Sequence, residues 1–455
     1  MAALQIILTI VVVALLLLAI SKKFQATTTL ICLGVVTILI YSIVTKTPVG
    51  TSGSWFIDVF ELIASNFSKQ MSGSGLLIMS VMGFVKYMDH IKASKLLALY
   101  ASRPLKKLGK PYLAAGLGIF IAAVLKLCIP SHSGLAALLM ATMYPILVAA
   151  GLPTLTAAAA VLIGGCFDLG PACPITNWAV TQEPVAALTN IADFFVNYQV
   201  VRTLVVILVT TVVFVLLSKK ADAKEGHAGE VSDDVVDPKS LGVPGFYAVL
   251  PVLPLVLVIV FSSLFNTGIK IGVPAANFLS FIVAFIIDLI FTKSKRVDSF
   301  NGTNEFWKGM GASFTSVVSL IGAAAVFSAA INYIGGTKAM MNSIANSSLG
   351  GVVIVIAAAL INFLIAFITG SGVASSYAVL PMLYDPVAAS GANLLLVVFA
   401  IVASGGMGRA ISPVSGATII VGGGSGHEVT DITKRTMIPV CTGFVAMIVM
   451  ALIGM

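Results

Sequence analysis

Two uncharged stretches of this chain are longer than a membrane crossing requires. Between Lys126 and Asp168 lie 41 residues without Asp, Glu, Lys or Arg, and between Lys338 and Asp385 lie 46. About 20 apolar residues span a bilayer as an α-helix. Over the whole chain 58% of the residues are hydrophobic and 10% are charged, whereas about a quarter are charged in soluble domains. The sequence therefore predicts an all-α polytopic membrane protein embedded in a lipid bilayer.

Apolar runs predict where the helices lie. Single helices are expected near 4–20, 27–45, 74–91, 155–180, 198–218, 244–265, 274–292, 310–332, 392–420 and 436–454. Two further apolar stretches, 112–150 and 350–390, are too long for one span, and each has a small polar interruption in its middle. We interpret each as a re-entrant hairpin. Two full spans would fit the charge pattern equally well, because neither choice changes the side on which the other loops lie.

The basic residues favour one orientation. With the amino terminus outside, 19 of the 26 Lys and Arg residues fall in inside loops, and Lys46, Lys69, Lys270 and Lys338 fall outside. Short cytoplasmic loops carry such an excess of positive charge. The pattern predicts that both termini lie outside, which for an inner-membrane protein is the periplasm. The formal net charge of +8 reflects this orientation, and no soluble basic face is present for nucleic acid.

A hydrophilic segment, 219–243, divides the chain into two halves with the same plan. Residues 1–218 and 244–455 each have two helices, a short amphipathic segment with Trp (54–67 and 299–310), a third helix, an arm, a hairpin, a broken helix and a closing helix. Each half crosses the membrane five times if its hairpin does not cross. An odd number of crossings predicts an inverted repeat, the plan of many secondary transporters.

Small and polar residues interrupt the apolar runs at four places. The interruptions are Pro130–Gly134, Gly170–Asn177, Thr369–Gly372 and Gly408–Gly416. Irregular backbone at membrane depth is tolerated where it faces protein or a water-filled cavity. Half-helices that begin there point unpaired N–H groups and a positive dipole end toward one place, which suits an anion. Ordinary kinks are the alternative, but four of them would have to fall in matching pairs.

Few charges lie at membrane depth. Arg409 lies inside one interruption, and its guanidinium suits a carboxylate, although it could instead cap carbonyl groups of the broken helix. Lys126 and Asp168 are expected within ion-pair distance, either as a structural pair or as part of a substrate or cation site, because an isolated charge at this depth is costly. His132 could bind a carboxylate, carry a coupling proton or satisfy hairpin backbone. The five cysteines lie in apolar stretches without a CxxC motif, so neither a disulfide framework nor a metal–thiolate site is expected.

Four sequence stretches resemble the anaerobic C4-dicarboxylate carriers of the DcuC type. They are SGLAALLMATMYPILV at 133–148, FYAVLPVLP at 246–254, TGSGVASSYAV at 369–379 and GRAISPVSG at 408–416. With the order of the repeats, the similarity covers nearly the whole chain. The chain departs from the family pattern at Pro171–Asn177, and at Lys126 and Asp168, where the family is usually uncharged.

The resemblance implies a transporter of the ion-transporter superfamily that works as an elevator, often as a homodimer. Residues 1–91 and 244–332 would be scaffold, 92–110 and 335–349 arms, 219–243 a cytoplasmic linker, and 112–218 and 350–455 the moving transport parts. The expected activity is transport of C4-dicarboxylates such as succinate, fumarate or malate, by exchange or with a cation. The predicted substrate-binding residues are Arg409, Ser131, His132, Ser133, Thr369, Ser371, Thr176, Asn177, Ser412, Ser415 and Lys126.

Other functions stay open at this point. A larger or differently charged carboxylate is one alternative. A cation or proton antiporter is another, with a sodium site at Asp168, Asn177 and Ser371; Na⁺ or H⁺ could equally be a coupling ion, and no other cofactor is expected. A membrane enzyme using Ser425 and His427 is the third and the least favoured, because both lie in a Gly-rich loop at the membrane edge.

Overall fold

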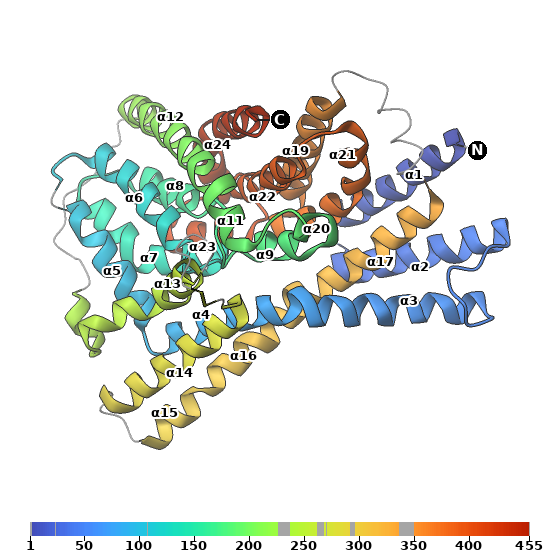
Figure 1. Ribbon diagram of the computed structural model, residues 1–455. Helices are drawn as coiled ribbons and strands as arrows, with labels where there is room; N and C mark the ends of the chain where they lie inside the picture. The colour runs from blue at the N-terminus through green and yellow to red at the C-terminus, as the bar shows by residue number, and fades with distance from the viewer. Residues whose placement is uncertain are drawn as a thin grey trace.

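The computed structural model describes residues 2–22, 24–106, 108–225, 237–261, 268–269, 271–291, 296–335 and 350–454. All regular structure within these ranges is helical (Figure 1). The second arm predicted at 335–349 lies, apart from residue 335, outside the described residues.

The first part of the chain, to residue 225, contains α1 (Ala2–Ser21), α2 (Ala26–Thr45), α3 (Trp55–Gln70), η1 (Met71–Gly75), α4 (Leu76–His90), α5 (Ala93–Lys106), α6 (Pro111–Leu125), α7 (His132–Ala149), α8 (Thr154–Gly164), α9 (Pro174–Thr181), α10 (Glu183–Ala186), α11 (Ile191–Phe194), η2 (Phe195–Val200) and α12 (Val201–Glu225). The second part contains η3 (Pro238–Leu241), η4 (Gly245–Val252), α13 (Leu253–Val260), α14 (Val273–Phe291), α15 (Arg296–Gly302), α16 (Asn304–Ser313), η5 (Phe314–Val318), α17 (Ser319–Ile334), α19 (Gly350–Thr369), α20 (Gly372–Val379), η6 (Leu380–Met382), α21 (Tyr384–Ser390), α22 (Leu394–Ala410), α23 (Gly416–Ser425) and α24 (Val429–Leu452). The segments η1, η2 and η5 are π-helical turns, and η3, η4 and η6 are 3-10 helices.

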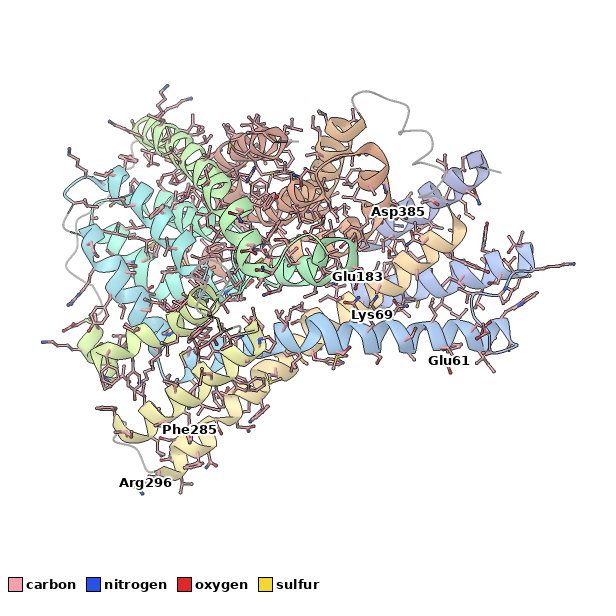
Figure 2. All side chains as sticks on the ribbon, viewed as in Figure 1. Glu61, Lys69, Glu183, Phe285, Arg296 and Asp385 are labelled. Carbon is pink, nitrogen blue, oxygen red and sulfur yellow. The ribbon has the colours of Figure 1, made fainter. Side chains whose placement is uncertain are left out.

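Seven of the described helices are long and apolar enough to cross a membrane, judged by length and composition. Their outer faces are apolar: Leu204, Leu208, Val212 and Leu216 repeat every fourth residue along α12 and are all exposed. Such a stripe fits lipid rather than water. Figure 2 shows the charged residues Arg296 and Asp385 on opposite sides of the molecule. The prediction of a helical membrane protein therefore agrees with the structure.

Three predicted boundaries are wrong. The helix expected at 244–265 begins as the 3-10 helix η4 and becomes α-helical only at Leu253, because Pro251, inside η4, lacks the N–H group that an α-helix needs at that position. The closing helix of the first half does not end at residue 218. It continues to Glu225, so the linker begins as helix. The amphipathic segments at 54–67 and 299–310 are not separate from the third helices, since π-turns η1 and η5 join α3 to α4 and α16 to α17.

The two long helices formed in this way pack against each other in opposite directions. Helix α4 contacts α16, α3 contacts α17, and the π-turns η1 and η5 touch where the helices cross (Figure 1). The contacts are reciprocal. A Cβ on Gly83 would lie 2.8 Å from the backbone oxygen of Phe306, and a Cβ on Gly322 would lie 2.7 Å from the ring of Phe67. Glycine at these two positions therefore allows the helices to approach closely.

Helices α5–α12 and α19–α24 gather on one side of this crossing (Figure 1). Helix α12 packs on α24, α7 on α23, α6 on α8, and α19 on α22. Their buried side chains form one continuous apolar core that includes α7, α8, α22 and α24. Each of the four predicted interruptions leaves helical geometry, at 126–131, 165–173, 370–371 and 411–415.

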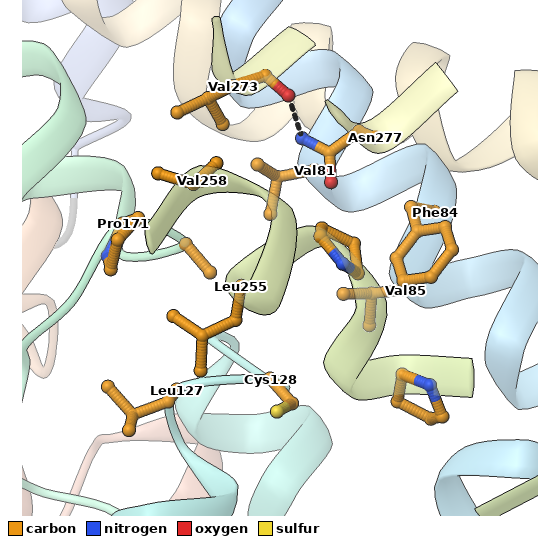
Figure 3. A pocket seen from close by; sticks show the side chains of 13 residues that line it. Val81, Phe84, Val85, Leu127, Cys128, Pro171, Leu255, Val258, Val273 and Asn277 are labelled. Carbon is orange, nitrogen blue, oxygen red and sulfur yellow. Dashed lines mark hydrogen bonds between the residues drawn. The ribbon is translucent and has the colours of Figure 1, made fainter. Parts of the chain in front are cut away.

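The first two interruptions also meet α13 at an apolar contact. Leu127, Cys128 and Pro171 face Leu255 and Val258 of α13 around a cavity of about 20 Å³ (Figure 3). The amide of Asn277 is turned away from these groups, since its Nδ2 donates to the Val273 backbone oxygen at 2.9 Å (Figure 3). Apart from Asn277 and Cys128, the side chains that line this cavity are apolar.

Candidate functional site

All four interruptions open onto one cavity of about 220 Å³. Its lining comprises Met82, Pro130, Ser131, His132, Ser133, Asp168, Cys173, Pro174, Ile175, Ser316, Val317, Gly370, Ser371, Val373, Arg409 and Ser415. Two of these, Ser316 and Val317, belong to the π-turn η5, and Met82 belongs to α4. The cavity therefore lies between the long crossed helices and the body that contains the interruptions.

Four helices begin at this cavity. Their N-cap residues are Ser131 for α7, Cys173 for α9, Ser371 for α20 and Ser415 for α23, and all four line it. The Ser131 and Ser371 hydroxyls accept hydrogen bonds from the Gly134 and Ala374 N–H groups, at 3.1 and 3.2 Å. The side chains of Cys173 and Ser415 make no such bond.

The helix starts make the cavity electropositive. The first turn of an α-helix has N–H groups without intrahelical partners, and its dipole favours negative charge. Two of the four starts, those of α9 and α23, also lack a side-chain acceptor at the cap. The arrangement is therefore suited to an anion with more than one acceptor group.

Three charged side chains meet beside the cavity. The Arg409 Nη2 group donates to both carboxylate oxygens of Asp168, at 2.6 and 2.8 Å. Lys126 Nζ lies 3.3 Å from Asp168 Oδ1 and donates to the Pro130 backbone oxygen at 2.6 Å. The side chains are 8%, 3% and 1% exposed for Arg409, Asp168 and Lys126. The predicted Lys126–Asp168 ion pair is confirmed, and Arg409 is a third member that the sequence did not reveal.

Two glycines create the space that these groups occupy. A Cβ on Gly406 would lie 2.3 Å from the Cys166 backbone oxygen and 2.9 Å from Asp168 Oδ2. A Cβ on Gly165 would lie 2.6 Å from the His132 ring. Neither position can hold a larger residue without movement of the neighbouring group. The glycines therefore fix where Asp168 and His132 lie.

His132 is held by the first broken helix rather than by its own hairpin. Its Nε2 lies 3.3 Å from the Leu162 backbone oxygen of α8. A carbonyl can only accept, so Nε2 carries the proton in this contact. The Nδ1 atom is buried, and it has no hydrogen-bond partner among the described residues.

Seven of the predicted site residues line the cavity, and five lie behind it. Ser131, His132, Ser133, Asp168, Ser371, Arg409 and Ser415 are in the lining, whereas Lys126, Thr176, Asn177, Thr369 and Ser412 are not. Those behind hold the interrupted backbone. Asn177 donates to the Pro171 oxygen, Thr369 donates to the Ile365 oxygen at 2.8 Å, and the Ser412 hydroxyl accepts from the Val414 N–H at 3.4 Å.

Only part of the set proposed for sodium lines the cavity. Asp168 and Ser371 line it and Asn177 does not. The Asn177 Nδ2 donates to the Pro171 oxygen, its Oδ1 is buried without a hydrogen-bond partner among the described residues, and Arg409 and Lys126 contact Asp168. Two fixed cations next to the carboxylate disfavour a third. Within the described ranges, no group of three or more His, Cys, Asp and Glu residues is placed to hold a metal ion.

Two buried amides that the sequence analysis missed hold the interruptions in place. Gln199 accepts from the Gly170 N–H at 2.9 Å and donates to the Thr176 hydroxyl at 3.0 Å. Asn362 donates to the Ile401 backbone oxygen at 2.8 Å, next to the Ser376 and Ser404 hydroxyls. Each is an uncharged polar residue inside an apolar run, and this is the pattern that could have identified them.

The chain matches the model of one protein family over residues 4–455, and that family is described as DcuC, the C4-dicarboxylate anaerobic carrier. The chain belongs to this family. It is 27% identical over 435 residues to the anaerobic C4-dicarboxylate transporter DcuC of Escherichia coli strain K12, covering 94% of this chain and 92% of the relative. The probable anaerobic C4-dicarboxylate transporter DcuC of Vibrio cholerae is 26% identical, covering 88% and 86%. The resemblance found in the sequence is thereby confirmed.

Two solved transporters share the fold. The structure of MtrF from Neisseria gonorrhoeae, described as illuminating a class of antimetabolite efflux pumps, matches with a TM-score of 0.61 at 17% identity and covers 96% of both chains. The YdaH transporter of Alcanivorax borkumensis matches with a TM-score of 0.63 at 16% identity and covers 94% of this chain and 98% of that one. The DcuC-family chain is therefore a multi-pass helical membrane protein of the same general fold.

The family is one of transporters and not of enzymes, and the geometry around Ser425 and His427 agrees. The Ser425 hydroxyl donates to the Val421 backbone oxygen at 2.7 Å, and His427 Nε2 lies 3.0 Å from the Thr154 hydroxyl. The histidine is therefore engaged with another residue and not with the serine that it would have to activate.

A second ionic cluster of this DcuC-family chain lies outside the cavity. Arg435 of α24 donates to Asp222 and Glu225 of α12, at 2.9 and 2.7 Å. The Asp222 carboxylate also accepts from the hydroxyls of Thr156, at 2.8 Å, and Tyr112, at 3.0 Å. Asp222 is buried. The cluster joins α6, α8, α12 and α24, and its role is to hold these four helices together.

Proposed function

We propose that this protein is a secondary active transporter of C4-dicarboxylates across the bacterial inner membrane. The observation that carries the proposal is the convergence of four helix starts and Arg409 on one cavity, in a chain of the C4-dicarboxylate carrier family. Succinate, fumarate and malate each present two carboxylate groups, and helix N-termini together with a guanidinium are good partners for carboxylates.

The lining of the cavity suggests which predicted residues bind substrate and which position the backbone. Arg409 binds one substrate carboxylate, while Ser131, Ser133, Ser371 and Ser415 and the adjacent N–H groups bind the other. His132 supplies a further polar contact. Thr176, Asn177, Thr369 and Ser412 position the interrupted backbone, and Lys126 acts through Asp168.

Transport requires that the cavity reach both sides of the membrane in turn, and an inverted repeat would provide this. The reciprocal contacts support such a repeat: the same shift along the chain carries Gly83 onto Gly322 and Phe67 onto Phe306, so each half makes the contact that the other makes. Two copies of one element related by a two-fold axis give this pattern. In the inverted plan, 112–150 and 350–390 are re-entrant hairpins.

An elevator motion fits the position of the cavity. Residues 1–91 and 244–332 form the fixed scaffold and the contact of a homodimer, and 112–218 and 350–455 move with the substrate. The apolar contact around Leu127, Cys128 and Leu255 (Figure 3) would permit the moving part to slide along the scaffold. In this arrangement the termini lie in the periplasm and the linker in the cytoplasm, which the distribution of Lys and Arg favours.

The test is counterflow of radiolabelled succinate in proteoliposomes that contain the full chain. Unlabelled succinate inside should drive accumulation of label, and acetate inside should not. A parallel series with and without Na⁺, and with and without a proton gradient, identifies the coupling ion. Accumulation driven only by a larger organic acid would identify another carboxylate as substrate. Cation exchange without any carboxylate would replace the proposal with an antiporter.

A further inference from the structure

Arg409 already has a carboxylate partner in this structure. Both oxygens of Asp168 accept from its Nη2, at 2.6 and 2.8 Å, within a site that is almost completely buried. Asp168 therefore occupies one of the three nitrogens of the guanidinium that a substrate carboxylate would bind, while the buried Nε has no hydrogen-bond partner among the described residues. A dicarboxylate cannot use Arg409 fully unless Asp168 releases it or shares it.

Asp168 has a second partner available on its other side. Lys126 Nζ lies 3.3 Å from Oδ1 and is tethered to the first hairpin by its bond to the Pro130 oxygen. The carboxylate could leave Arg409 without becoming an unpaired charge, because Lys126 would still neutralise it. A buried charge that loses its partner without replacement is costly.

The net charge of the empty site depends on Asp168. With Asp168 in place, two cations and one anion leave a single positive charge. Without it, Arg409 and Lys126 would carry two uncompensated positive charges through the membrane when the empty site returns, and such charges are expensive at membrane depth.

We propose that Asp168 is a resident carboxylate that holds Arg409 in the empty carrier and yields it to a substrate carboxylate, while Lys126 retains Asp168. The inference rests on the proposed dicarboxylate transport and adds a positioning role to it. Asp168 competes with substrate, which weakens binding and aids release. It also lowers the charge of the empty site from two positive charges to one, which makes the return of the empty carrier less costly and hence permits net transport as well as exchange.

The experiment compares exchange with net efflux of radiolabelled succinate in proteoliposomes. For Asp168→Asn we expect the KM of exchange to fall at least tenfold and the ratio of net efflux to exchange to fall at least tenfold. The double variant Lys126→Met with Asp168→Asn restores the total charge of the cluster but supplies no resident carboxylate, so it should fold better and keep the low ratio. The matched control is Asp222→Asn, which removes a buried Arg-paired carboxylate outside the cavity; it should lower both modes by the same factor.

Parallel losses of exchange and net efflux in the Asp168 variants, with KM unchanged or raised, would overturn the inference while leaving the proposed function standing. A wild-type protein that neither exchanges nor releases succinate would overturn both. If no Asp168 variant folds, infrared difference spectra of the wild-type protein decide. Binding of ¹³C-labelled succinate should then shift an unlabelled carboxylate band of the protein, and the absence of such a shift would count against a resident carboxylate.

Discussion

Gly406 lies so close to Asp168 that a Cβ at this position would come within 2.9 Å of the carboxylate Oδ2. The same Cβ would lie 2.3 Å from the Cys166 backbone oxygen. Gly406 precedes Arg409 by one helical turn in α22, so a single helix supplies both the partner of Asp168 and the space in which the carboxylate sits. The position of Asp168 thus depends on a residue that carries no functional group.

We expect Gly406→Ala to reduce succinate exchange at least tenfold, because Asp168 and the backbone at Cys166 must both shift to admit the methyl group. Gly423→Ala, in the adjacent helix α23, is the matched control, since a Cβ at Gly423 has no atom within 4 Å. Transport rates normalised to folded protein in proteoliposomes give the comparison. Equal activity of the two variants would mean that the site tolerates movement of Asp168.

Arg409→Ala should abolish carboxylate transport and leave folded protein, because Asp168 keeps Lys126 as a partner. Losing a hydrogen bond to a charged group costs about 1.5–3 kcal/mol, which corresponds to roughly tenfold to 150-fold weaker binding. Arg409→Lys should restore little, since a point charge does not reproduce the planar donor pattern of a guanidinium. Near-normal uptake by Arg409→Ala would exclude this residue from the binding site.

The sequence was informative about where the backbone breaks. Ser131 and Ser371 each precede a Gly- or Ser-rich helix start, and local chemistry of this kind is visible in a single chain. The Lys126–Asp168 contact could also be predicted, because an unpaired charge in apolar surroundings is costly and pairing with an opposite charge offsets that cost. Local pattern and the cost of burying charge together located most of the cavity.

The partner of Arg409 could not be predicted in the same way. Asp168 and Arg409 lie in different halves, and only the packing of α22 against the first broken helix brings them together. Asp222 and Arg435 are a second example, since both lie just outside the helices expected at 198–218 and 436–454. Their pairing follows from the contact of α12 with α24, which no local pattern in the sequence specifies.

Asp222→Leu should destabilise the protein severely, because Arg435 would lose its buried partner and the hydroxyls of Thr156 and Tyr112 would lose their acceptor. Removing one member of a buried ion pair typically costs about 3–5 kcal/mol. Thr156→Val, which removes one donor to the same carboxylate, should cost only about 1 kcal/mol. Thermal unfolding in detergent measures both, and a mild effect of Asp222→Leu would show that water reaches Arg435.

The orientation predicted from the basic residues can be tested with single cysteines in a background that lacks the five native ones. Thr51→Cys, on an exposed loop between α2 and α3, should react with an impermeant maleimide added to right-side-out vesicles. Ala228→Cys, in the hydrophilic linker, should react only in inverted vesicles. The opposite pattern would place the termini in the cytoplasm and reverse the side of every loop.

The relative stabilities of variants in the buried charge cluster test whether Lys126, Asp168 and Arg409 form one three-membered cluster. If Lys126 and Asp168 formed an isolated pair, each single neutralisation would be worse than the double. Because Arg409 also binds Asp168, Lys126→Met leaves a complete ion pair and should be the mildest change. Asp168→Asn leaves two cations facing each other and should be the most destabilising, while the double variant, with Arg409 alone unpaired, should fall between them.

Unfolding temperatures of the three variants in one detergent give the order of their stabilities. The contrary result is that Lys126→Met lowers the unfolding temperature as much as Asp168→Asn does. That result would mean that the ion pair of Arg409 with Asp168 is not sufficient to stabilise the cluster without Lys126.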